Sequence, residues 1–226
     1  MPDARFADAL DWIAFLSAVT EHITFGTGML ILPEHNPVEL AERAATIDQL
    51  SGGRLLLGVG WLKEEFDALG VPWEHRGTRT DESIQVMRHL WATDEATFTG
   101  RFTRFQKVRC FPRPLQVPGI PVIIGGHTEA AAERAGRIGD GFYPAAPPDR
   151  VAELLRIVRR SAQDSGRDPA RIEITAGAGR DGDADTVKRY RDLGVTRVMV
   201  SLPTKNPADL RHSLDALHDS LISKVS

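Results

Sequence analysis

The chain has 226 residues, of which 42% are hydrophobic and 26% charged, so it can bury a sizeable core and is neither disordered nor a small disulfide scaffold. The chain contains 28 Lys and Arg residues and 31 Asp and Glu residues, and it has no basic tract. Nucleic acid is therefore not an expected partner, because its phosphate backbone requires clustered positive charge. The single Cys110, the lack of an apolar stretch of about 20 residues and the lack of a secretory signal predict a cytoplasmic protein without a membrane span.

The first half of the chain alternates helices and strands. Asn36 before Pro37 is typical of a helix N-cap, and the Gly52-Gly53 pair is typical of a helix end. The expected elements, in chain order, are a helix over 6–21, a strand over 23–32, a helix over 37–50, a strand over 54–60 and helices over 63–69 and 80–91.

A hairpin interrupts this alternation. Residues 97–105 alternate around a turn at Gly100, which predicts two antiparallel strands outside the main sheet. Four prolines then predict an extended connector over 112–121. Just before it, Cys110 and its neighbour Arg109 allow a reactive thiol, but a small packing residue is the favoured interpretation.

The second half returns to alternation. The expected elements are strands over 122–124, 141–145, 171–176 and 195–202, helices over 128–138, 151–165 and 184–193, and a last helix carrying Leu210, Leu214, Leu217 and Leu221. Six core strands joined by helices predict an α/β fold with a parallel sheet. That number is two short of a closed eight-stranded barrel, and the chain opens on a helix as though strands 1 and 2 were missing.

Glycines after strand 122–124 mark a possible phosphate site. Gly125 and Gly126 remove side chains from the turn, and Thr128 is the expected N-cap of the following helix. Because helix N-termini offer unpaired N–H groups, a phosphate can sit there; an ordinary strand-to-helix turn is the alternative.

Two other strands carry glycines of interest. Gly58 and Gly60 precede Trp61, which either stacks on a planar ligand ring or packs in the core. Gly28 lies inside the predicted strand 23–32 and indicates a bulge or a close backbone approach. Glu34 and His35 follow this strand. They are candidates for acid–base chemistry, and a polar turn is the alternative interpretation.

Other motifs are rejected. Residues 177–182 match G-x-G-x-x-G, but Asp181, Asp183 and Asp185 crowd the place where a pyrophosphate would bind. The seven histidines show no zinc spacing, so no metal site is expected. No G-x-S-x-G elbow supports a serine hydrolase.

Three runs together resemble the bacterial luciferase-like superfamily of flavin- and deazaflavin-dependent oxidoreductases. They are LSGGRLLLGVGWLKEEF over 50–66, IGGHT over 124–128 with GDGFYP over 139–144, and GTGM over 26–29 with NP over 36–37. The resemblance extends over essentially the whole chain and is closest to the branch that uses coenzyme F420.

This resemblance implies a (β/α)8 TIM-barrel type of fold whose ring-bearing cofactor, coenzyme F420 or alternatively FMN, lies at the carboxyl ends of the strands. It also implies a cis peptide bond between Gly28 and Met29 that backs the central ring. The cofactor contacts that it implies are Gly28, Met29, Gly60, Trp61, Glu64, Gly125, Gly126, His127, Thr128 and Glu129.

Two departures from the family pattern matter. The turn after Gly58 is two residues shorter than in many relatives, and the strands that carry the family's catalytic acid and histidine have no counterpart. No catalytic residue is therefore named, and either the protein begins upstream of Met1 or it is naturally truncated. Uncovered sheet edges near 23 and 196 predict a homodimer or a covering partner.

The resemblance leaves several functions open. The first is an oxidoreductase that moves a hydride between reduced F420 and an organic substrate. The alternatives are an FMN-dependent monooxygenase and a non-catalytic barrel remnant that binds a flavin. A phosphate-binding barrel isomerase is disfavoured, because Asp181 and Asp183 stand where its phosphate turn is needed.

Overall fold

The computed structural model describes residues 8–179, 183–201 and 206–223. The chain forms two compact units, unit 1 over Met1–Ile123 and unit 2 over Ile124–Ser226, and each is described by itself. The main sheet has parallel strands in the order β1-β2-β5 in unit 1 and β5-β6-β7-β8 in unit 2, with β5 (Val122–Gly125) spanning the division. The six predicted core strands are confirmed; the prediction of one domain over 1–226 stays a prediction.

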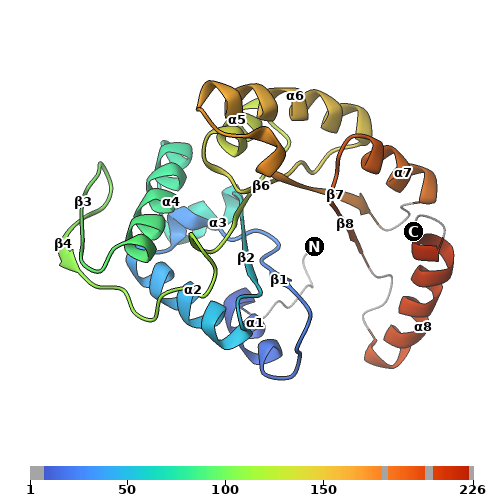
Figure 1. Ribbon diagram of the computed structural model, residues 1–226, viewed down its shortest axis with the longest axis horizontal. Coiled ribbons are helices and arrows are strands. Elements are labelled where there is room, and N and C mark those ends of the chain that lie inside the picture. The colour runs from blue at the N-terminus through green and yellow to red at the C-terminus, as the bar shows by residue number, and fades with distance from the viewer. Residues whose placement is uncertain (1–7, 180–182, 202–205, 224–226) are drawn as a thin grey trace. The chain divides into compact units, whose positions relative to one another are not determined.

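Unit 1 begins with a short helix and a short strand (Figure 1). Its elements are α1 (Ala9–Ser17), β1 (Phe25–Gly26), the 3-10 turn η1 (Leu32–Glu34), α2 (Pro37–Ser51), β2 (Leu55–Val59), α3 (Lys63–Leu69), α4 (Arg76–Ala92), β3 (Ala96–Thr99) and β4 (Arg104–Val108). Asp8 caps α1 with its side chain, and the helix ends at Ser17 rather than at the predicted residue 21. The residues before 8 lie outside the described part.

The helix predicted after Asn36 is confirmed at both ends. The Asn36 side chain accepts a hydrogen bond from the Val38 amide, Pro37 occupies the first turn, and Gly52 closes the helix with a φ of 70°. On its buried side, Asp48 accepts hydrogen bonds from the amides of Leu115 and Gln116, which fixes the proline-rich connector against α2. The connector contains no helix or strand, as predicted.

The strand predicted over 23–32 is wrong in length. Only Phe25 and Gly26 form β1, and they pair with Leu55 and Leu56 of β2. The chain then leaves the ladder and returns at Leu30, which bridges to Val59. The ladder is interrupted between Gly26 and Leu30, which is where Gly28 predicted a bulge.

The predicted hairpin is confirmed: β3 and β4 pair antiparallel and stand out beside α4 (Figure 1). The connection between them turns at Gly100, whose amide donates to the Thr103 carbonyl at 2.9 Å. Cys110, just after β4, is buried, and burial raises the pKa of its thiol. The packing interpretation of this cysteine is therefore supported over the reactive one.

Unit 2 continues the strand–helix alternation. Its elements after β5 are α5 (Glu129–Ile138), β6 (Gly141–Tyr143), α6 (Pro148–Asp164), the 3-10 turn η2 (Pro169–Arg171), β7 (Glu173–Gly179), α7 (Ala184–Asp192), β8 (Arg197–Val200), α8 (Pro207–Leu217) and the π-helical turn η3 (His218–Ile222). The rejected G-x-G-x-x-G motif starts inside β7, and its residues 180–182 lie outside the described part.

Apolar side chains are exposed on α1 and just after it. Trp12 and Phe15 are 52% and 61% exposed and stack on each other, and Val19 is 68% exposed. Such a surface suits the predicted homodimer, which stays a prediction. Among the residues that the structure describes, no helix is both long and apolar enough to cross a membrane.

Candidate functional site

The part of the candidate site in unit 1 is the bulge between β1 and η1. The Thr27 hydroxyl donates to the Gly58 carbonyl at 2.8 Å, and the Leu30 amide donates to the same oxygen at 2.7 Å. Residues 28 and 29 therefore protrude between two anchored neighbours. A Cβ placed on Gly28 meets nothing within 4 Å, so a flat ligand has room to approach the backbone there.

Met29 and Gly60 are brought together in this part of the site. A Cβ on Gly60 would lie 3.1 to 3.2 Å from the Cβ, Cγ and Sδ atoms of Met29, so the absence of a side chain at Gly60 admits the methionine. The family resemblance implied both residues as cofactor contacts, but nothing in the sequence indicated that they contact each other.

The expected cis peptide between Gly28 and Met29 is wrong for this structure. The cis bonds of the described residues precede Pro112 and Pro118. Residues 28 and 29 leave the ladder without such a bond, because hydrogen bonds from Thr27 and Leu30 to Gly58 anchor the bulge on both sides.

Trp61 and Glu64 follow at the carboxyl end of β2. Trp61 is half-buried, and its Nε1 donates to the Thr80 hydroxyl at 3.0 Å. The Arg76 guanidinium lies over its ring at 5.1 Å from the centroid. Glu64 is exposed in the first turn of α3. Trp61 thus contacts α4, and its role toward a ligand ring stays a prediction.

Glu34 lies in η1, directly after the bulge. Its Oε1 atom is buried and has no hydrogen-bond partner in the described part of the chain. Burial raises the pKa of this carboxyl, and the charge of Glu65 raises it further. Burial and then Arg43 lower the pKa of the neighbouring His35. The Glu34 carboxyl is therefore a weaker acid than usual and the His35 imidazole a weaker base.

We expect Glu34→Gln to raise the melting temperature at pH 7 and to leave it unchanged near pH 4. The folded state holds the Glu34 proton more tightly than the unfolded state, so its stabilising effect is complete below the ordinary pKa of 4.5 and is lost as the pH rises through the raised value. Thermal unfolding at several pH values measures this. Glu42→Gln, on the exposed side of α2, is the control, and an equal gain at pH 4 and pH 7 would contradict the burial argument.

The part of the candidate site in unit 2 is the turn between β5 and α5. Gly126 has a φ of 137°, its amide donates to the Tyr143 carbonyl at 3.1 Å, and a Cβ there would lie 2.9 Å from the Ala131 side chain. The Thr128 hydroxyl accepts from the Ala131 amide at 3.2 Å, which confirms the predicted N-cap. His127, Thr128 and Glu129 are exposed, and Gly125 is half-buried.

Tyr143 is a residue of this part that the sequence reasoning did not single out. It ends β6 beside the turn, and its hydroxyl lies 2.9 Å from the position of a Cβ on Gly177 of β7. Burial raises the pKa of its phenol, so the group keeps its proton at neutral pH and remains a hydrogen-bond donor. The sequence signals for it were its place in the GDGFYP run over 139–144 and the opposing Gly177, which belongs to the rejected motif.

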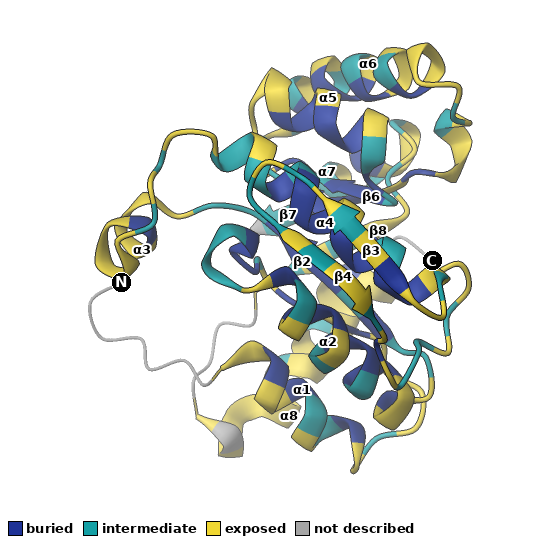
Figure 2. Cartoon of the chain, turned by 90° about the vertical axis from the view of Figure 1, so that its left-hand side faces the viewer, coloured by how far each residue is buried: buried dark blue, intermediate teal, exposed yellow. Residues whose placement is uncertain are grey.

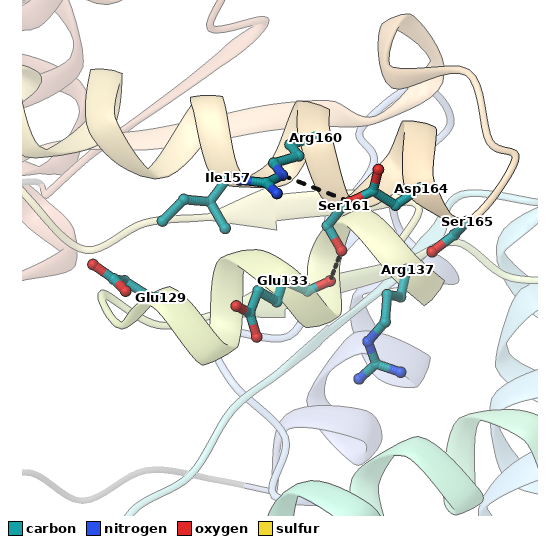
Figure 3. Close-up of a pocket in the computed structure, with 8 residues that line it drawn as sticks. All are labelled: Glu129, Glu133, Arg137, Ile157, Arg160, Ser161, Asp164 and Ser165. Carbon is teal, nitrogen blue, oxygen red and sulfur yellow. Dashed lines mark hydrogen bonds and ion pairs between the residues drawn. The ribbon is translucent and has the colours of Figure 1, made fainter.

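Glu129 also borders a groove between α5 and α6 (Figure 3). The groove has a volume of about 560 Å³ and is lined by Glu129, Glu133, Arg137, Ile157, Arg160, Ser161, Asp164 and Ser165. Ser161 donates to the Glu133 carbonyl at 2.9 Å, and Arg160 pairs with Asp164 at 3.7 Å. The groove is a polar surface between two helices and differs from the turn after β5. Among the described residues, no group of His, Cys, Asp and Glu is arranged to hold a metal ion.

Comparison with known proteins gives the family. The luciferase-like monooxygenase family matches residues 1–203. This chain belongs to that family. The Mycobacterium tuberculosis protein Rv0940c is 33% identical to it over 238 residues, which cover 100% of this chain and 81% of that protein. The resemblance stated from the sequence motifs is thereby confirmed.

Two further relatives have named cofactors. The F420-dependent glucose-6-phosphate dehydrogenase of Intrasporangium calvum is 29% identical over 233 residues, covering 96% of this chain and 69% of that protein. The FMNH(2)-dependent dimethylsulfone monooxygenase of Pseudomonas putida is 38% identical over 133 residues, covering 57% of this chain and 36% of that protein. The family thus contains both F420-dependent and FMN-dependent relatives of this chain.

Solved structures show the fold. The F420-dependent tetrahydromethanopterin reductase of Methanopyrus kandleri matches with a TM-score of 0.84 at 17% identity, over 97% of this chain and 88% of that one. An F420-dependent secondary alcohol dehydrogenase matches with a TM-score of 0.84 at 19% identity, over 99% and 86%. These likenesses confirm the predicted α/β fold of the TIM-barrel type.

Proposed function

We propose that this chain binds coenzyme F420 and acts as an oxidoreductase that moves a hydride between the reduced deazaflavin and an organic substrate. Membership of the luciferase-like family supports redox chemistry with a flavin-type cofactor. The F420-dependent relative aligns with 96% of this chain and the FMN-dependent one with 57%, which favours F420 over FMN. FMN-dependent monooxygenation is the alternative.

The observation that carries this proposal is the bulge in unit 1. Gly28 is exposed with open space where a side chain would stand, while Met29 is held against Gly60. An exposed backbone segment that is anchored at Thr27 and Leu30 offers a firm, flat support for a planar ring. The residues present therefore fit the ring that the family's cofactors carry.

In unit 2, we propose that the turn before α5 holds the cofactor phosphate. The first amides of α5, those of Glu129 and Ala130, have no acceptor among the described residues, and Gly126 leaves the turn without a side chain. Unpaired amides and the helix dipole attract an anion without any charged side chain. The Thr128 hydroxyl, already a cap, is close enough in sequence to assist.

Each part has a separate task in the proposed reaction. F420, when bound, supplies the hydride. Within unit 1, the bulge is proposed to support the ring. Within unit 2, the turn before α5 is proposed to offer its amides to a phosphate, and Tyr143 offers its phenolic proton for a hydrogen bond. Trp61 is proposed as an apolar wall at the end of β2, where it excludes water from the ring.

Separate titrations of the purified chain with F420 and with FMN, followed by cofactor fluorescence, test the proposal. We expect F420 to bind with a dissociation constant of about 1 μM to 10 μM. Gly28→Val, which fills the open space, is expected to weaken F420 binding at least about tenfold, whereas Gly26→Val on β1 should not. Binding of FMN alone would favour the alternative, and binding of neither cofactor would overturn both.

A further inference from the structure

Three arginines gather in unit 1 where the hairpin meets α4. Arg76 and Arg79 lie on the first turns of α4, three residues apart and hence on one face. Arg101 lies in the connection between β3 and β4, and its Nη2 is 3.0 Å from the Nε2 of His75, the residue before α4. Figure 2 shows the hairpin lying along α4 on the side that faces the viewer.

Aromatic rings hold these guanidinium groups in place. Arg76 lies 4.2 Å from the ring centre of Trp73, and Arg79 lies 4.2 Å from that of Phe102. Arg101 lies 5.2 Å from the same Phe102 ring, which joins the hairpin arginine to the helix arginine. A stacked guanidinium loses mobility but keeps its N–H groups free at the edges of the plane, where they can still bind an anion.

In the described part of the chain, no carboxylate forms an ion pair with any of the three arginines. Among the described residues, none of them has an ion-pair partner within 4.0 Å, whereas Arg43 of the same unit pairs with Asp8 at 2.9 Å. The Nε atoms of Arg76 and Arg79 are buried without an acceptor. Partly burying an unpaired cation is costly, so a structure that positions several of them together suits an anionic ligand.

The buried Glu82 side chain is engaged by the hairpin backbone. Glu82, one turn further along α4, accepts hydrogen bonds from the amides of Arg101, Phe102 and Thr103 at 2.6 to 2.8 Å. These bonds fix the hairpin connection over the helix, and within the described residues Glu82 forms no ion pair with the three arginines. Arg101 donates to His75, which must therefore present an unprotonated nitrogen to it.

We propose that Arg76, Arg79 and Arg101 form a binding subsite for an oxyanion, a phosphate or a carboxylate group. Arginine is suited to both because its planar fork of donors matches two oxygens at once. The subsite adjoins the candidate site of unit 1 through Trp61, whose ring lies under Arg76. The anion belongs either to the substrate or to the cofactor, and the subsite does not depend on the proposal that the cofactor is F420.

Titration of the whole chain with inorganic phosphate and with citrate at low ionic strength tests the subsite. Trp61 and Trp73 lie against Arg76, so tryptophan fluorescence should report the binding. We expect a saturable change with a dissociation constant of about 1 mM or lower, weakened by added sodium chloride.

Variants separate this subsite from general surface charge. Arg79→Gln and Arg101→Gln are expected to weaken anion binding at least about tenfold each, and Arg79→Lys to restore only part of it. Arg104→Gln removes the same charge from an exposed position on β4 and should change the affinity by less than about twofold. Circular dichroism of each variant verifies folding.

A comparison of FMN with riboflavin distinguishes the source of the anion. If the cofactor phosphate occupies the subsite, inorganic phosphate competes with FMN and Arg79→Gln abolishes the preference for FMN over riboflavin. If a substrate anion occupies it, phosphate and FMN bind together and that preference remains. Either result supports the subsite. Absence of saturable anion binding, or an equal loss in Arg104→Gln and Arg79→Gln, overturns it regardless of which cofactor binds.

Discussion

Gly58→Ala is expected to lower the free energy of unfolding by about 3 kcal/mol or more, because the new methyl group would overlap the carbonyl oxygen of Thr27. That oxygen belongs to the backbone of the segment beside β2, so it cannot move aside as a flexible side chain would. Thr27 also donates its hydroxyl to the Gly58 carbonyl, and this bond would be strained at the same time. Urea unfolding followed by circular dichroism measures the loss.

Gly28→Ala is the matched control for Gly58→Ala. It adds the same methyl group at the residue that directly follows Thr27, but nothing lies within 4 Å of that methyl position. We expect a change in stability of less than about 0.5 kcal/mol. If both variants lose the same stability, the close approach of Thr27 and Gly58 is not what requires the glycine. If neither does, the bulge is looser than the structure indicates.

Local signals in the sequence were sufficient for much of the fold. The Asn36-Pro37 start and the Gly52 end of α2 follow from capping chemistry that depends on neighbouring residues only. The same holds for Thr128 before α5 and for the turn at Gly100 between β3 and β4. Each of these features is determined within a few residues of chain, which is why composition and spacing predict it.

The bulge shows where local signals end. Gly28 correctly indicated an irregularity, but apolar residues on both sides favoured a strand over 23–32, and only the hydrogen bonds from Thr27 and Leu30 to Gly58 show how short β1 is. Those bonds join residues about 30 positions apart, so no window of sequence contains them. The same limitation applies to the packing of Met29 against Gly60.

The arginine cluster could not be predicted from spacing. Arg76 and Arg79 look like ordinary polar residues of an exposed helix face, and Arg101 like a charged residue in a turn. They come together because Glu82 binds the hairpin connection over α4, which is a long-range contact. An R-x-x-R pair followed by a buried glutamate was the available signal, and its meaning depends on the hairpin that folds over it.

Glu82→Ala is expected to destabilise unit 1 by about 4 kcal/mol or more and to abolish anion binding in the protein that remains folded. The Glu82 side chain is 8% exposed and accepts three backbone hydrogen bonds from residues 101–103, and bonds to a charged acceptor contribute about 1.5 kcal/mol or more each. Without it, Arg101 and Phe102 lose their position over α4, and Arg79 loses the ring on which it stacks.

Thermal unfolding, phosphate titration and amide hydrogen exchange at residues 101–103 measure the three consequences of this change. Glu82→Gln keeps one acceptor oxygen and should lose about half as much stability, while Glu74→Gln, exposed just before α4, should lose almost none. Rapid exchange at 101–103 together with unchanged phosphate affinity would show that the arginines hold their positions without the glutamate. Loss of affinity together with rapid exchange in a folded protein would instead show that a buried carboxylate organises the cationic subsite by fixing the backbone of residues 101–103.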